Sequence, residues 1–127
     1  MAAMLRIVDS ITELGPGDQG CIAVSGSHGG VSSARYALAA RPLLTVFNDA
    51  GVGKDKAGTA ALSLLQQQGL AAATVSHDSA RIGDAQSSLA DGIISHLNAA
   101  AAAWGLSAGQ PCREAISGLQ NISRRQA

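Results

Sequence analysis

Three short apolar runs, each followed by a polar stretch that contains glycine or serine, set the pattern of this chain. The runs occupy residues 21–25, 43–47 and 71–75. A continuous apolar run of this length is typical of a strand buried on both faces of a parallel sheet. Between and after the runs, apolar residues recur at helical spacing. This spacing predicts helices over residues 32–40, 55–68 and 84–104.

Residues that begin or end helices support these bounds. Asp55 and Asp84 are suitable N-caps for the second and third helices, and Gly69 is a suitable stop for the second. Pro42 ends the first helix, because the residue before a proline avoids helical geometry. Residues 105–110 are predicted to form a loop.

The two ends of the chain complete the prediction. Pro111 suits the first turn of a final short helix, in which Cys112, Ile116 and Leu119 share one face. Residues 5–14 fit both a helix and a strand, and we expect a short helix there, closed by the turn at 15–18.

Strands that alternate with helices predict an α/β fold with helical crossovers. We expect one domain over residues 1–127, with three layers and a short, mostly parallel sheet of three to four strands. Right-handed crossovers place the carboxyl ends of all parallel strands on one edge. Ligands of such sheets bind at that edge, where the strand order reverses.

The distribution of charge favours a site at this edge. Residues 48–56 and 76–84 carry 7 of the 18 formal charges of the chain, which has 9 Lys and Arg and 9 Asp and Glu. The predicted helices are mostly Ala, Ser, Leu and Gln. Charges on a merely solvated surface would spread along those helices.

The amino-acid composition and the net charge of the chain indicate which partners it can bind. Hydrophobic residues make up 46% of the chain but aromatic residues only 2%, so the core consists of small side chains that each bury little area. We therefore expect a homo-oligomer. The formal net charge is +0, which argues against nucleic acid and anionic membranes as partners.

The sequence shows neither a membrane span nor a signal peptide, which indicates the cellular compartment. No apolar run approaches the length of a membrane span, and residues 1–6 do not resemble a signal peptide. Cys21 and Cys112 are isolated, and Cys21 lies in an apolar run, which fits a buried free thiol. We expect a cytoplasmic protein.

The stretch Ser25–Gly30 follows the first predicted strand. Its glycines and the start of the next helix suit a phosphate or carboxylate, so Ser27, Gly29 and Gly30 are candidate ligand-binding residues. A tight turn that only caps the helix is the alternative. The spacing is not the dinucleotide fingerprint. No nucleotide-cofactor motif is present elsewhere, and the cofactor stays unknown.

The stretch 48–55 resembles a P-loop only superficially. The first glycine of that motif would fall on Asn48 and its Ser or Thr on Asp55, which excludes the motif. Asn48 and Lys54 are candidate ligand-binding residues. Asp49 is a candidate general base, although an Asx turn explains it equally well.

The stretch 76–84 combines several reactive types of side chain. His77 can move protons near neutral pH, and Arg81 can pair with a carboxylate or phosphate. Ser79 and Asp84 are further candidate ligand-binding residues. The alternative is that Arg81 pairs with a neighbouring Asp and ties the loop down.

We expect His28 and His77 to act as an acid/base pair, with Asp49 assisting. No His spacing supports a metal site. His96 is assigned to helix packing. The hypothesis is a small enzyme, of the isomerase, lyase or hydrolase type, that acts on a small anionic metabolite. The alternative is a non-catalytic ligand-binding or accessory subunit that uses the same pocket.

Overall fold

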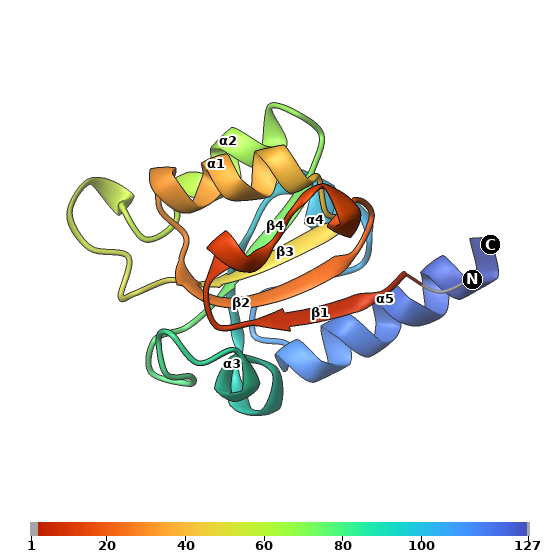
Figure 1. Ribbon diagram of the computed structural model, residues 1–127. Coiled ribbons are helices and arrows are strands. Elements are labelled where there is room, and N and C mark those ends of the chain that lie inside the picture. The colour runs from red at the N-terminus through yellow and green to blue at the C-terminus, as the bar shows by residue number, and fades with distance from the viewer. Residues whose placement is uncertain (1–2, 127) are drawn as a thin grey trace.

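A computed structural model describes residues 3–126 of the protein. Its centre is a five-stranded sheet in the order β1-β2-β3-β4-β5 (Figure 1). The strands are β1 (Leu5–Val8), β2 (Ile22–His28), β3 (Leu44–Asn48), β4 (Ala71–Val75) and β5 (Ile94–Leu97). The first four are parallel, and β5 runs antiparallel to β4. The mixed α/β class and mostly parallel sheet agree with the sequence prediction, but there are five strands rather than three or four.

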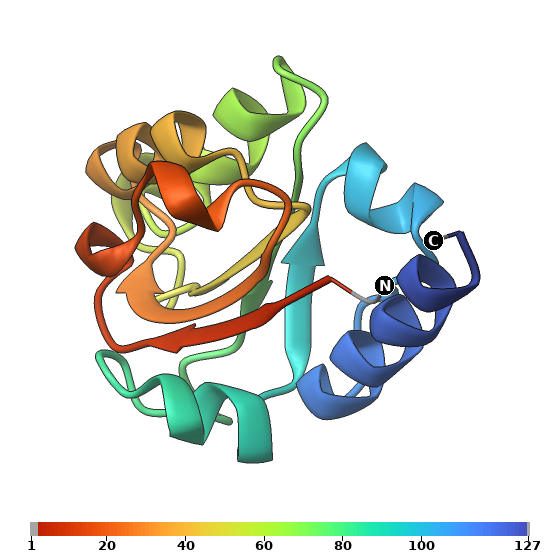
Figure 2. The same ribbon diagram turned by 45° about the vertical axis from the view of Figure 1, so that its right-hand side comes forward.

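Helices cover both faces of the sheet (Figures 1 and 2). The first face carries the 3-10 helices Ile11–Glu13 and Pro16–Asp18 and the helices α1 (Val31–Ala40) and α2 (Ala60–Gln66). The opposite face carries α3 (Ala85–Asp91) and α5 (Cys112–Gln126). The short α4 (Ala99–Ala103) follows β5.

The strand order explains this division. Four consecutive parallel strands whose right-handed crossovers all step in the same direction place those crossovers on one face. The opposite face is left for the helices after β4. The strand order of the described sheet never reverses, so the predicted reversal point is absent. Because the strand order does not reverse, a ligand site at the edge of the sheet depends on the conformation of the loops.

Small side chains dominate both layers of the core. On the α1/α2 side, Ala34, Ala37 and Ala61 are fully buried around Phe47. Both cysteines are buried and free, as predicted for Cys21, and burial raises the pKa of Cys112 to about 12.

The prediction of a short helix over 5–14 is wrong for its first half. Residues Leu5–Val8 pair with β2 as an edge strand, and only Ile11–Glu13 is helical. Ser10 caps this 3-10 turn and exchanges hydrogen bonds with Glu13 in a capping box. The β-branched residues therefore follow their strand preference because β2 offers them a partner.

The single helix predicted over 84–104 is also wrong, since this segment forms α3, β5 and α4. Asp84 does cap α3, where its carboxylate accepts the N–H of Ser87 at 3.0 Å. Gly92 ends α3, and a side chain there would collide with Ser88 and Val75. This close approach lets the chain turn into a strand beside β4.

Two further helix predictions are partly right. Asp55 does not cap α2, because residues 54–56 form a separate 3-10 turn and α2 begins at Ala60. Gly69 does follow α2, with a φ of +71°. The final helix begins at Cys112, directly after Pro111, which the prediction placed in its first turn; it is longer than expected, and Cys112, Ile116 and Leu119 are buried.

Within the described residues, no helix combines the length and the apolar character that crossing a membrane requires.

Replacing Asn98 with Ala should destabilise the protein by about 2–3 kcal/mol, because its side chain joins β4, α2 and α4. Its oxygen accepts the N–H of Ala72 and Ala101, and its amide donates to the carbonyls of Leu62 and Leu70. Urea unfolding measures the loss. The exposed Asn121→Ala is the control and should change stability by less than about 0.5 kcal/mol.

Candidate functional site

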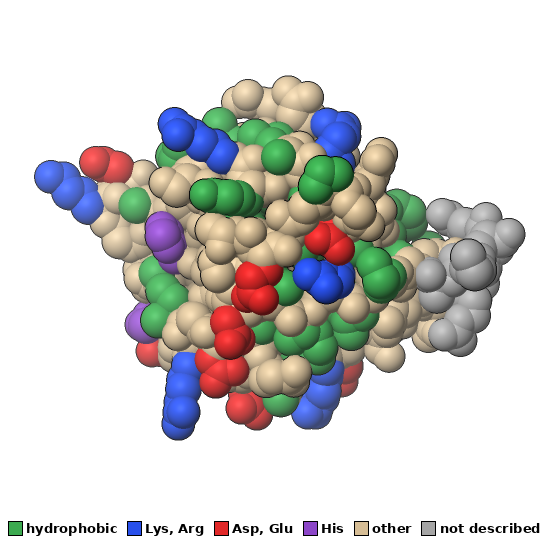
Figure 3. All heavy atoms as spheres, viewed as in Figure 1, with side chains coloured by type: hydrophobic (Ala, Val, Ile, Leu, Met, Phe, Trp, Pro, Cys, Tyr) green, Lys and Arg blue, Asp and Glu red, His purple; other side chains and the backbone are tan. Residues whose placement is uncertain are grey.

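The carboxyl ends of β2, β3 and β4 lie side by side at one edge of the sheet. His28 at the end of β2 pairs with Asn48 on β3, and Asn48 pairs with Val75 on β4. The three polar loops therefore start from the same edge. Figure 3 shows histidine side chains on this side of the molecule, at the left of the view.

Asp49, the first residue after β3, is the centre of this edge. Its side chain is only 6% exposed. Oδ1 accepts the N–H of Gly51 at 2.8 Å and the N–H of His77 at 3.0 Å. The first bond closes the Asx turn that the sequence offered as the alternative. The second joins the loop after β3 to the loop after β4.

Two imidazoles flank the Asp49 carboxylate. Nδ1 of His77 lies 3.5 Å from Oδ1, and Nδ1 of His96 lies 3.9 Å from Oδ2. Both imidazole side chains are about half exposed, at 52% and 47%. A buried carboxylate thus contacts two proton-carrying groups that solvent can reach.

Burial by itself would raise the pKa of Asp49. Hydrogen bonds from the Gly51 N–H, the Ser95 hydroxyl and the His77 N–H, together with the His77 imidazole, more than offset this effect. The pKa of Asp49 therefore lies below its ordinary value of 3.8, and the group is an anion near neutral pH.

Hydroxyl groups extend the network behind Asp49. The Ser95 hydroxyl lies 2.8 Å from that of the buried Thr74 and 3.3 Å from Nδ1 of His96. The single proton of the Ser95 hydroxyl can go to the Thr74 carbonyl, 3.4 Å away, or to the Asp49 carboxylate. These polar groups therefore converge on one carboxylate.

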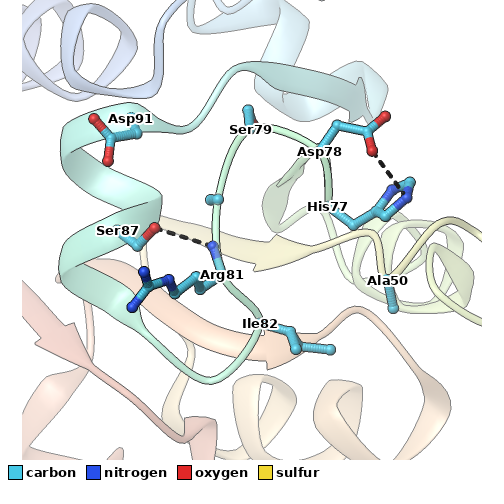
Figure 4. A pocket seen from close by; sticks show the side chains of 9 residues that line it. Ala50, His77, Asp78, Ser79, Arg81, Ile82, Ser87 and Asp91 are labelled. Carbon is cyan, nitrogen blue, oxygen red and sulfur yellow. Dashed lines mark hydrogen bonds and ion pairs between the residues drawn. The ribbon is translucent and has the colours of Figure 1, made fainter.

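A pocket of about 750 Å³ opens beside this network (Figure 4). Its walls come from the loop at 77–82, from Ala50 and from Ser87 and Asp91 of α3. In Figure 4 the imidazole of His77 and the guanidinium of Arg81 extend to opposite sides of the loop. Among the described residues, no carboxylate lies within 4.0 Å of the Arg81 guanidinium. A ligand that contacts both side chains has to bridge the loop.

The histidine that follows β2 is arranged differently. His28 is exposed, does not line this pocket, and packs beside its own neighbour Gly30. Ser27 accepts the N–H of Ile11 at 2.9 Å. Gly29 is buried against the carbonyl of Gly58, and Gly30 precedes α1 as its N-cap. The structure does not bring His28 and His77 together at the pocket.

The other predicted ligand-binding residues have local partners or lie at a loop tip. Asn48 is buried, donates to the carbonyl of Ala80 and accepts the N–H of Ala50. Ser79 lines the pocket, but its hydroxyl donates to the Ser76 carbonyl and accepts the N–H of Ile93. Asp84 caps α3, and Lys54 is exposed.

The loop after Asp49 has an unusual backbone. Ala50, Val52, Asp55 and Lys56 all have positive φ values, from 50° to 67°. This conformation is uncommon for residues other than glycine and strained for a β-branched one. Gly58 closes the loop so tightly that a Cβ there would collide with the carbonyl oxygen of Asp49. The position of Asp49 therefore depends on glycine at position 58.

Metal binding finds no support in the arrangement of ligands. The structure, over the residues it describes, contains no group of three His, Cys, Asp or Glu side chains that could hold a metal ion.

The sequence prediction missed Ser95 and His96 as residues of this cluster. Both lie within a segment whose apolar spacing resembles a helix. The pair Ile93-Ile94 beside Gly92 is the one local indication of a strand, because β-branched residues favour strands and glycine ends helices.

The stabilising effect of Asp49 should depend on pH. The pKa of Asp49 is lower in the folded protein than in the unfolded chain. The ionised carboxylate therefore stabilises the fold at every pH above its unfolded pKa. This stabilisation is lost as the pH falls through the folded pKa. Asp49→Asn keeps an acceptor for both N–H groups, so it should be less stable than the wild type at about pH 7, by a margin that shrinks as the pH falls below 3.8. Urea unfolding across this range measures the gap, and a gap that stays constant would contradict the assignment.

Gly58→Ala should destabilise the protein by at least about 2 kcal/mol, because the new methyl group displaces the Asp49 backbone. Gly118→Ala is the matched control. No atom lies within 4 Å of a Cβ at this exposed helical position, so the change should stabilise by about 0.5–1 kcal/mol. If a side chain at position 58 does collide with Asp49, thermal and urea unfolding will show a loss of stability for Gly58→Ala and a gain for Gly118→Ala.

Compared with known proteins, the chain matches no family model, no curated protein and no solved structure, so its function has to be inferred from the site itself.

Proposed function

We propose that this protein is a small enzyme that transfers protons on a small metabolite bearing a carboxylate or phosphate group. The observation that carries the proposal is the contact of a buried, ionised Asp49 with the imidazole of His77 at the wall of the pocket. A carboxylate behind an imidazole fixes its orientation and stabilises the imidazolium that forms when it takes a proton.

His77 is the proposed proton carrier. With Nδ1 directed at Asp49, Nε2 is the nitrogen that can accept a proton. It lies 3.2 Å from the carboxylate of Asp78, whose side chain is 86% exposed. A substrate can displace such an exposed contact at little cost. Nε2 then takes the proton from a substrate C–H bond, the bonding pair stays on carbon, and the imidazolium returns a proton or exchanges it with water.

Arg81 is the proposed anion-binding residue. Its guanidinium lines the same pocket and has no carboxylate within ion-pair distance among the described residues, so it is available to a ligand. A planar guanidinium binds carboxylate and phosphate groups through two parallel hydrogen bonds. Because Arg81 and His77 extend to opposite sides of the loop, the substrate would be elongated, with the anionic group remote from the reacting carbon.

A non-catalytic ligand-binding or accessory role remains the second candidate. The existing contact of Nε2 of His77 with Asp78 favours it, since that contact has to break before any proton transfer. In this role, the pocket would bind the same anionic ligands without any exchange of protons.

Solvent exchange distinguishes the two functions. The protein is incubated in D₂O with a panel of small carboxylic acids and phosphorylated metabolites, and proton NMR follows the uptake of deuterium at carbon. An acid/base enzyme incorporates deuterium into one class of compound. His77→Gln should slow this uptake about 10²- to 10⁴-fold without loss of fold.

The matched pair Arg81→Gln and Arg35→Gln tests anion binding. Arg81→Gln should weaken binding of the exchanging compound about tenfold or more, whereas Arg35→Gln, an exposed change on α1, should not affect it. If no compound takes up deuterium but one of them raises the melting temperature of the wild type and not of Arg81→Gln, the protein is a binding module. Normal uptake by His77→Gln would refute the proposed role of His77.

A further inference from the structure

The antiparallel strand β5 brings a second set of side chains to Asp49. Thr74 on β4 pairs with His96, and Val75 pairs with Ile94, so Ser95 is an extra residue that has no partner in the ladder. An irregularity of this kind re-aims side chains, and such bulges are frequent beside active sites.

The irregularity explains how adjacent residues reach one carboxylate. Neighbouring side chains of a regular strand point to opposite faces of the sheet. Here the Ser95 hydroxyl lies 3.3 Å from Nδ1 of His96, and the same nitrogen lies 3.9 Å from Oδ2 of Asp49.

The two oxygens of Asp49 have different partners. Oδ1 accepts two backbone N–H groups and lies beside His77. Oδ2 faces His96. The χ2 torsion of an aspartate rotates easily. Contacts at Oδ2 of Asp49 therefore restrict the direction of Oδ1.

We propose that His96 is a positioning residue of this site: its imidazole, beside the second carboxylate oxygen of Asp49, restrains the carboxylate so that the first oxygen stays directed at Nδ1 of His77. The inference rests on the proposed role of His77 as the proton carrier. Its consequence is a fixed tautomer. A neutral His77 that carries its proton on Nδ1, facing Asp49, leaves Nε2 free to accept a proton from the substrate.

The tautomer of His77 can be measured without a substrate. The chain has 3 histidines, so nitrogen-15 NMR of the imidazole rings resolves each of them once single variants assign the signals. The Asp78 carboxylate lies 3.2 Å from Nε2 and can only accept a hydrogen bond, so the test is made in Asp78→Ala, where we expect neutral His77 to carry its proton mainly on Nδ1. His96→Ala should change the ratio of tautomers about three- to fivefold toward Nε2, the size expected for a half-exposed pair.

Three variants make the test specific. His96→Gln retains a side-chain N–H donor and should restore most of the ratio seen with His96. Asp49→Asn should remove the Nδ1 preference. His28→Gln removes an exposed imidazole outside the pocket and should leave the His77 ratio unchanged. A change confined to folding would alter the melting temperature but not the tautomer.

The outcomes separate this inference from the proposed function. If His96→Ala leaves the ratio unchanged in the folded Asp78→Ala protein, or if His77 of Asp78→Ala carries its proton on Nε2, the positioning role is refuted whether or not the protein exchanges deuterium. If the ratio shifts as expected while no metabolite takes up deuterium, the positioning role stands and the proposed enzymatic function fails.

Discussion

The burial of one carboxylate organises the edge of this sheet. A charge removed from water has to be compensated by hydrogen bonds, and Asp49 obtains them from two backbone N–H groups and a hydroxyl. These donors come from three different segments: the loop after β3, the loop after β4 and strand β5. Satisfying Asp49 therefore fixes the relative positions of those segments. The His77 imidazole contacts the carboxylate as a result of this arrangement.

The sheet topology determines which residues can take part. Consecutive parallel strands place the carboxyl ends of β2, β3 and β4 on one edge, but without a reversal of strand order no crevice opens between neighbouring crossovers. The pocket lies instead between the loop at 77–82 and α3. His28, on β2, is outside it. Residues that lie close together along a sheet edge therefore do not always form one site, because the conformation of each loop also determines the direction of its side chains.

Strand β5 is the element that local sequence could not reveal. Its residues follow the apolar spacing of a helix, and the helix is interrupted at Gly92 because the backbone there packs against Val75. The resulting strand pairs with β4 and brings Ser95 and His96 to the network. Such a long-range pairing overrides local helical preference, as is common for strands.

The sequence by itself determined the alternation of three buried strands with helices, the stop at Gly69, the cap at Asp84 and the clustering of charge in two loops, because these depend on hydrophobic periodicity and local backbone chemistry. Tertiary structure alone decided the two edge strands β1 and β5, the strand order, and which polar side chains meet. Those features depend on pairing between distant segments. The contact of Asp49 with His96, 47 residues apart in number, exists only once β5 lies beside β4.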